Sequence, residues 1–195
     1  MREFILKASL ATTANFSLND LPGAGRMDVI CRSINSAFWI SDGLRKNTKM
    51  YIVLEGKPNP SLTIELDSSK IKRFSPDERN IASHIKIAIN KFNELRGIVE
   101  SEPGVIIMER NFKELISSKH ENTQLIYLDP SGVDIREFRF KENFCCILGD
   151  HIGIDEKTKN LLDKLSVEKI SVGPNVYLSS TVIAVINNEL DRRGI

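Results

Sequence analysis

The feature that most constrains this chain is the alternation of short apolar runs with amphipathic segments of helical period along its 195 residues. Apolar runs of a few residues are typical of buried strands, and apolar residues that recur every three or four positions are typical of helices. Strands alternating with helices favour an α/β fold with a mainly parallel sheet flanked by helices. The length suits a single domain, which we expect to cover residues 1–195.

The pattern assigns each segment a type. The expected strands are 2–10, 49–54, 62–66, 71–74, 105–108, 124–128, 143–148 and 167–172. The expected helices are 26–40, 75–95, 111–118, 158–165 and 178–193. Ser75 as cap, Pro76 at the first helical position and Glu78 as reciprocal partner predict the start of the second helix. Gly97 and Pro103-Gly104 bound a segment expected to be a mobile connection.

Three strand-end loops, at 128–132, 148–153 and 172–177, are the expected ligand site. Ligands of parallel sheets bind outside the carboxyl ends of the strands. Gly149 and Gly173 follow apolar strands, and a residue without a side chain lets a ligand approach the backbone. Apolar strand ends with exposed amides suit a flat purine, and the absence of Lys and Arg from the last two loops argues against a triphosphate. The alternative is that all three loops are simple tight turns.

Other sequence signals exclude several classes of protein. A composition with 41% hydrophobic and 27% charged residues excludes a disordered chain and a disulfide miniprotein. Gly23-Ala24-Gly25 lacks the third glycine of a dinucleotide cradle, and the motifs of P-loop enzymes, common esterases and zinc proteases are missing. Three cysteines and three scattered histidines predict no metal site. No stretch reaches the ~18 apolar residues of a membrane span, so we expect a cytoplasmic protein without a membrane partner.

Positive charge is concentrated in one region although the formal net charge is only +1. Residues 70–96 contain seven Lys and Arg against three Asp and Glu. A basic strand and helix suit a phosphate backbone, and Arg26 adds to this patch from a neighbouring loop. The alternative is an ordinary solvated helix face.

Several segments together resemble the archaeal tRNA pseudouridine N1-methyltransferases, a family of the SPOUT superfamily of trefoil-knotted methyltransferases. The segments that carry the resemblance are 16–26 (FSLNDLPGAGR), 75–80 (SPDERN), 148–153 (LGDHIG), 171–174 (SVGP) and 186–191 (INNELD). They occur in the same order as in the family and cover essentially the whole chain. The resemblance implies a SPOUT fold whose C-terminal segment threads a trefoil knot, and a homodimer.

The resemblance also implies S-adenosylmethionine as methyl donor. By analogy the cofactor-binding residues lie on the three strand-end loops and in the last helix: Leu128, Gly149, Val172, Gly173, Pro174, Asn175, Val176, Tyr177 and Val182. Val182 stands where the family's usual pattern has a cysteine, and two polar positions within 178–181 also differ. This departure argues against a thiol in the reaction but leaves backbone contacts to the cofactor in place.

The implied substrate is tRNA, methylated at N1 of pseudouridine 54 in the T loop. Uridine uses N1 for its glycosidic bond, so only pseudouridine offers a free N1–H. The enzyme must align nitrogen, methyl and sulfur and help remove the N1 proton. Asp20, Arg26 and Asp77 are the predicted catalytic residues, with Asp150 a further carboxylate and His151 a further proton carrier. Asp77 as part of a helix start and Asp150 as a turn residue are the alternatives.

Arginines are the predicted RNA contacts: Arg26, Arg73 and Arg79. Two other functions stay open within the same fold, namely the same chemistry on ribosomal RNA, and RNA binding without catalysis, which Val182 supports. A small-molecule α/β enzyme is the third alternative and has fold analogy alone behind it.

Overall fold

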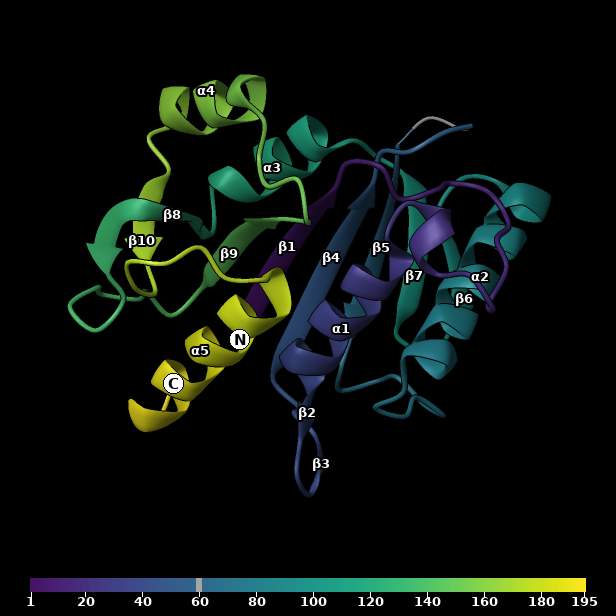
Figure 1. Ribbon diagram of the computed structural model, residues 1–195, viewed down its shortest axis with the longest axis horizontal. Helices are drawn as coiled ribbons and strands as arrows, with labels where there is room; N and C mark the ends of the chain where they lie inside the picture. The colour runs from purple at the N-terminus through teal and green to yellow at the C-terminus, as the bar shows by residue number, and fades with distance from the viewer. Residues whose placement is uncertain (59–60) are drawn as a thin grey trace.

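The structure is a computed structural model that describes residues 1–58 and 61–195. Its strands are β1 (Arg2–Ala8), β2 (Trp39–Ile40), β3 (Gly43–Leu44), β4 (Thr48–Leu54), β5 (Leu62–Asp67), β6 (Val99–Glu102), β7 (Val105–Glu109), β8 (Gln124–Asp134), β9 (Phe144–Gly149) and β10 (Glu168–Ser171). Its helices are η1 (Pro22–Ala24), α1 (Met27–Phe38), α2 (Glu78–Leu95), α3 (Phe112–His120), α4 (Glu156–Lys164) and α5 (Ser179–Arg192). Figure 1 shows them arranged around one central sheet.

The described strands form an eight-stranded sheet in the order β10-β8-β9-β1-β4-β5-β7-β6, and β2 and β3 form a separate hairpin. The pairings from β10 across to β4 are all parallel. The pairings among β4, β5, β7 and β6 are antiparallel. The prediction of an α/β fold with a mainly parallel sheet is therefore confirmed, with an antiparallel extension at one side.

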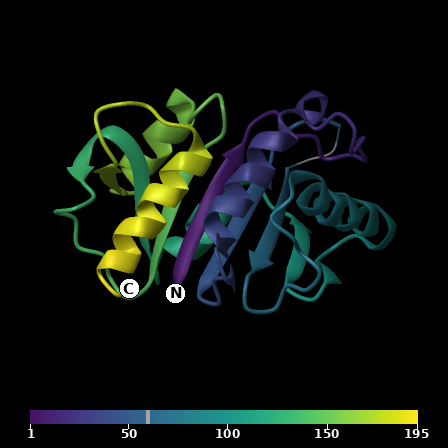
Figure 2. The ribbon, with the colours of Figure 1, turned by 60° about the horizontal axis from the view of Figure 1, so that its bottom comes forward.

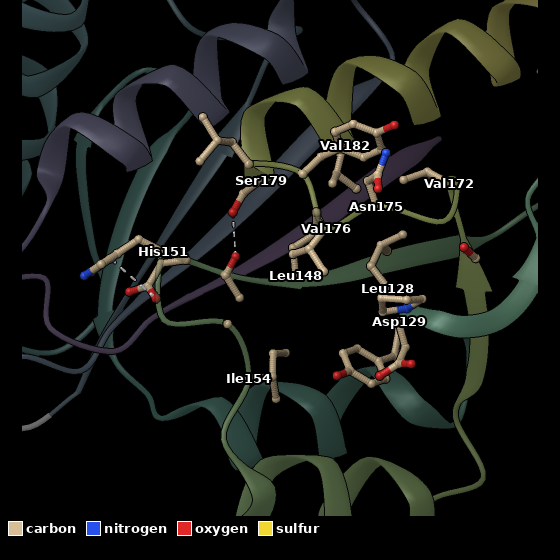
Figure 3. A pocket seen from close by; sticks show the side chains of 18 of the residues that line it. Leu128, Asp129, Leu148, His151, Ile154, Val172, Asn175, Val176, Ser179 and Val182 are labelled. Carbon is tan, nitrogen blue, oxygen red and sulfur yellow. Dashed lines mark hydrogen bonds and ion pairs between the residues drawn. The ribbon is translucent and has the colours of Figure 1, made fainter.

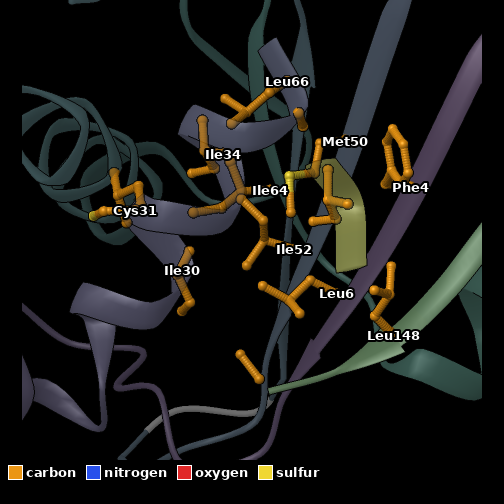
Figure 4. Packing of buried hydrophobic residues seen from close by; sticks show 14 of the residues in the cluster. Phe4, Leu6, Ile30, Cys31, Ile34, Met50, Ile52, Ile64, Leu66 and Leu148 are labelled. Atoms are coloured by element: carbon orange, nitrogen blue, oxygen red, sulfur yellow. The ribbon is translucent and has the colours of Figure 1, made fainter. Parts of the chain in front are cut away.

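Helices cover both faces of the sheet. Because side chains alternate along a strand, Phe4 and Leu6 of β1 pack with α1, α2 and α5, whereas Ile5 packs with α3 and α4. Figure 4 shows the first of these layers, where Ile30 and Ile34 of α1 meet the sheet. Each fully buried side chain of this size contributes about 1.5–3 kcal/mol, and the two layers hold the carboxyl ends of the parallel strands at one edge.

The last helix, α5, is held at the amino ends of the parallel strands, opposite the carboxyl ends. Arg2 donates from Nη2 to Asp191 Oδ1 (2.6 Å) and from Nη1 to Asn187 Oδ1 (3.1 Å). Arg45, just after the β2–β3 hairpin, donates two hydrogen bonds to the Asp191 carboxylate (2.7 and 2.6 Å). These bonds, Arg45 first and Arg2 second, lower the pKa of Asp191 to about 2. The helix therefore lies next to α1, with both termini close together (Figure 2).

The start of α2 differs from the prediction. Asp77, not Ser75, caps the helix, and its Oδ1 accepts a hydrogen bond from the backbone N–H of Asn80 (2.7 Å). Asp77 has the extended backbone of a capping residue, and Pro76 therefore precedes the helix. Two residues able to cap a helix stand two positions apart here, and the sequence prediction chose the first, Ser75, where the structure uses the second.

Two segments between residues 70 and 104 were also predicted wrongly. Residues 71–74 form no strand, because Arg73 adopts a left-handed backbone (φ 62°) that cannot continue one. The expected mobile connection contains β6, which forms a hairpin with β7. Gly104 makes this turn with φ 77°. Val99 is the single large apolar residue of β6, so its alternation was too short to detect.

Candidate active site

The three predicted loops meet around a cavity of about 490 Å³ at the carboxyl ends of β8, β9 and β10. The segment 172–178 and the first turn of α5 close its other side, and the side chains of Leu128, Leu148 and Val176 gather around the same space (Figure 3). Every predicted cofactor-binding residue except Pro174 lines it: Leu128, Gly149, Val172, Gly173, Asn175, Val176, Tyr177 and Val182.

The first loop is a bulge inside a strand. β8 pairs with β10 through Tyr127 opposite Lys169 and resumes with Val133 opposite Ile170. The residues between Tyr127 and Val133 are therefore extra relative to β10 and leave the ladder. This bulge carries Leu128, Asp129 and Pro130 into the cavity wall. The predicted end of the strand at residue 128 and the predicted loop at 128–132 were wrong, because β8 continues through this bulge to Asp134.

Gly149 is required by the chain itself. A Cβ on Gly149 would lie 2.3 Å from the carbonyl carbon of Gly153, so the loop 149–153 folds directly onto it. The sequence analysis explained this glycine by access of a ligand to the backbone. The structure gives a more basic reason for it, which is the close approach of two backbone segments. The carbonyl oxygen of Gly149 accepts a hydrogen bond from Ser179 Oγ (2.7 Å), which ties α5 to this loop.

Asp150 is a structural residue of the same loop. Its Oδ2 accepts from the backbone N–H of Ser9 (2.8 Å), and its Oδ1 accepts from that of Ile152 (2.9 Å). The alternative that Asp150 closes a turn is therefore confirmed. His151 also lines the cavity, with Nδ1 3.7 Å from Asp150 Oδ1.

Charge in the cavity is negative. Asp129 Oδ1 accepts hydrogen bonds from Ser131 Oγ (2.6 Å) and the Ser131 N–H (2.9 Å), and these bonds lower the pKa of Asp129. Lys159 is the one Lys or Arg among the described residues that line the cavity, and it pairs with Glu156 (2.9 Å). Apolar walls with an ionised carboxylate suit a cationic ligand with a flat apolar part better than a polyphosphate.

The predicted catalytic arginine lies beside this cavity at the start of α1. Arg26 has a left-handed backbone (φ 64°) and a two-point hydrogen bond to Asp28 (3.0 and 3.0 Å). Hydrogen bonds from Arg26, and secondly from Arg32, lower the pKa of Asp28 to about 2. The bond to Asp28 in turn raises the pKa of Arg26, with a smaller contribution from Asp150 on the cavity rim.

Asp20 and Asp77 are both engaged at turns and do not line the cavity. Asp20 Oδ1 accepts from the N–H of Gly23 (2.9 Å), and Asp77 caps α2 as described above. Arg79 Nη1 donates to Asn19 Oδ1 (2.6 Å), so the start of α2 holds the loop that carries Asp20.

The arginines predicted to contact RNA are divided between two places. Arg26 and Arg79 both lie near the N-termini of α1 and α2, which the Arg32–Glu78 ion pair joins (3.3 Å). Arg73 lies on the segment before α2, where its carbonyl oxygen accepts from Nε2 of His84 (3.2 Å). None of the three arginines lines the cavity.

Sequence reasoning gave no site role to five polar residues of the cavity, namely Tyr127, Asp129, Lys159, Ser171 and Ser179. Asp129 had a usable signal, because it is the first charged residue after the buried run of β8. Ser179 had none, since its role depends on the approach of α5 to the loop after β9. In the part of the chain that the structure describes, no cluster of three His, Cys, Asp or Glu residues is placed to hold a metal ion. No described helix has the length and apolar character of a membrane span.

Comparison with known proteins agrees with this architecture. The family model described as "Putative SAM-dependent RNA methyltransferase" matches residues 1–195. The tRNA (pseudouridine(54)-N(1))-methyltransferase of Methanococcus maripaludis strain C7 is 41% identical over 197 residues, with 98% of this chain and 99% of the relative covered. The protein of the same name from Methanocaldococcus jannaschii is 39% identical over 203 residues, covering 100% and 98%.

Among solved structures, Nep1 of Archaeoglobus fulgidus bound to S-adenosylhomocysteine superposes with a TM-score of 0.64 at 14% identity, covering 100% of this chain and 99% of that one. This likeness concerns the fold, and it confirms the predicted SPOUT architecture. The full-length sequence matches decide the family. The chain belongs to the tRNA (pseudouridine(54)-N(1))-methyltransferase family of SAM-dependent RNA methyltransferases.

Proposed function

We infer that this chain transfers the methyl group of S-adenosylmethionine to N1 of pseudouridine 54 in the T loop of tRNA. One observation carries this conclusion: the strand-end loops named from the sequence line a single cavity in a chain that matches curated enzymes of this name over its whole length.

The cavity suits S-adenosylmethionine. Its volume of about 490 Å³ lies in the range of small-molecule sites. Leu128, Leu148 and Val172 offer an apolar wall to the adenine, and the ionised Asp129 offers a negative charge to the cationic part of the molecule. Val182 lines the same wall in place of the family's cysteine and adds only apolar contact. When bound, the cofactor supplies an electrophilic methyl group.

The chain's own residues then have to hold the pseudouridine and accept its N1 proton. Arg26 is the predicted catalytic residue best placed to hold the base, because it bonds Asp28 and its charge interacts with the cavity-rim residue Asp150. Its guanidinium stays protonated, so it does not accept the proton. We assign Arg26 to orient the base or its phosphate. Asp20 and Asp77 stand on the neighbouring loop and helix start, and we assign them to the surface that receives the T loop. Arg73 and Arg79 extend this surface along the start of α2.

A second copy of the chain is proposed to complete the mouth of the cavity. Large apolar side chains are exposed there, namely Ile152 (55% exposed), Val176 (87%) and Leu178 (62%). A contiguous apolar patch at a polar rim is typical of an interface, and a homodimer would cover it. The family resemblance adds a trefoil knot formed by the C-terminal segment. A tRNA substrate is consistent with a cytoplasmic location.

The test is labelled-methyl transfer to two tRNA transcripts, one with pseudouridine and one with uridine at position 54. Transfer to the first alone supports the proposed reaction. Transfer to ribosomal RNA but to neither transcript would favour the same chemistry on another RNA. Cofactor binding without transfer to any RNA would favour a binding protein that has lost catalysis.

A further inference from the structure

A second groove also lies at the carboxyl ends of the strands, but on the face of the sheet that α3 and α4 cover. It has a volume of about 820 Å³ and opens between the N-termini of α3 and α4. Its charged lining residues are Lys7, Glu55, Lys113, Asp155, Lys157 and Lys164. We call it the α3/α4 groove. Neither the predicted cofactor site nor the predicted arginine surface includes any of these residues.

The floor of the groove is formed by the buried Lys7, which is paired with two carboxylates. Lys7 follows Leu6 on β1, so strand alternation directs it to the same face as Ile5 and toward α3 and α4. Its Nζ lies 2.8 Å from Glu55 and 3.0 Å from Asp155. Burial lowers the pKa of Lys7, but these two carboxylates outweigh burial and hold the pKa above its ordinary value.

The rim of the groove is basic. Lys113, Lys157 and Lys164 are exposed, and none of the three forms an ion pair in the described part of the chain. Four lysines against two carboxylates leave the charged lining with a formal charge of +2. Asn111 and Asp155 cap the two helices and also line the groove, so the positive ends of both helix dipoles point to it.

The α3/α4 groove adjoins the proposed active site. Ile154 and Lys159 line the first cavity, whereas Asp155, Lys157 and Thr158 line the groove, so the first turn of α4 is the wall between them. One helical turn spans about 5.4 Å. A nucleic acid strand with one base at the cavity mouth therefore reaches the groove within a few nucleotides.

We propose that the α3/α4 groove binds backbone phosphates of the tRNA that flank the modified nucleoside. The proposal rests on the proposed function, because it presumes that RNA is the substrate. It adds a second RNA-binding surface on the layer opposite α1 and α2. The exposed lysines contribute through counterion release and fix the position of the strand.

The test compares two double variants that remove the same charge. Lys157→Gln with Lys164→Gln removes two rim lysines, and Lys46→Gln with Lys141→Gln removes two exposed lysines outside both grooves. Binding to unmodified tRNA is measured between 50 and 200 mM salt. Each lost phosphate contact reduces the slope of log affinity against log salt by about 0.7–0.9, so the rim variant loses about 1.4–1.8 from the slope, which corresponds to about 25- to 60-fold in affinity at 0.1 M salt. The control pair should stay close to the wild type.

Other readouts separate this proposal from its alternatives. S-adenosylmethionine affinity and the melting temperature should be unchanged in the rim variant, and kcat at saturating tRNA should persist while KM rises. An unchanged salt slope overturns the proposal, whether or not methyl transfer is seen. If inorganic phosphate raises the melting temperature of the wild type but not of the rim variant, while tRNA affinity is equal, the groove binds a small anion and the RNA assignment is wrong. Failure of the proposed function instead shows as absence of methyl transfer with RNA binding intact.

Discussion

Asp28 is the residue on which the arginines at the start of α1 depend. It is buried, and it accepts hydrogen bonds from Arg26 and Arg32 at the point where α1 approaches both the cavity and α2. A buried carboxylate that is hydrogen-bonded to two guanidinium groups stays ionised. The same contact fixes the left-handed Arg26, so positioning of the predicted catalytic residue and stability of the helix start have one origin.

We expect Asp28→Asn to lower the free energy of unfolding at pH 7 by about 1–2 kcal/mol, because the amide cannot match the charge of two arginines. The pKa of Asp28 is about 2 in the folded chain against an ordinary 3.8, so its stabilisation is complete above about pH 4 and is lost as pH falls toward 2. Urea unfolding at several pH values measures this. A wild-type advantage that stays constant from pH 7 to pH 2.5 would contradict the assignment.

Val182 tests whether a thiol is needed at the cavity wall. It is 8% exposed and lines the cavity from the first turn of α5. Val182→Cys changes volume little, so we expect cofactor affinity and kcat to stay within about threefold. Val182→Phe fills the space and should abolish cofactor binding without lowering the melting temperature. Isothermal titration and methyl transfer measure both, and a tenfold gain in kcat for the cysteine variant would give the thiol a role.

At the scale of elements, α5 depends on a small set of ionic contacts. Arg2 is almost fully buried and donates hydrogen bonds to Asp191 and Asn187. Asp191 also accepts hydrogen bonds from Arg45. Asp191→Ala leaves a buried guanidinium without its carboxylate. Because Asp191 is itself part-exposed, we expect a loss of about 1–2 kcal/mol and faster amide exchange in α5. Asp42→Ala on the β2–β3 turn is the control, and equal exchange in both variants would contradict this anchoring.

Patterns in the sequence identified the elements with long apolar periods and missed those set by packing. The apolar runs of β1, β4 and β9 and the stripe of α2 carry strong signals, so they were found within a few residues. β6 has one large apolar residue and was missed. The bulge of β8 depends on pairing with β10, which lies about forty residues later in the chain. No local pattern reports such a partner.

For the candidate site, the position in the fold was predictable from the sequence, whereas the contacts between distant segments were not. Loops at the carboxyl ends of parallel strands follow from the fold class, so the cavity position and most of its residues were found. The reason for Gly149 and the contribution of Ser179 depend on segments that meet only in the folded chain. The family resemblance supplied the cofactor and substrate, which geometry alone would leave as a cationic ligand with a flat apolar part.

At the scale of the whole molecule, the apolar mouth of the cavity predicts assembly. We expect Val176→Asp with Leu178→Asp to convert a homodimer into a monomer, because two desolvated charges would oppose burial of the patch. Analytical ultracentrifugation at micromolar concentration measures this, and Leu95→Asp on the exposed end of α2 is the control. A monomeric wild type, or a variant that remains dimeric, would contradict the proposed interface.

The proposed reaction is tested by methyl transfer from labelled S-adenosylmethionine to paired tRNA transcripts that differ only in pseudouridine or uridine at position 54. We expect label in the pseudouridine transcript alone, because only that isomer has a free N1–H. Equal label in both transcripts, or none in either although the cofactor binds, would contradict it.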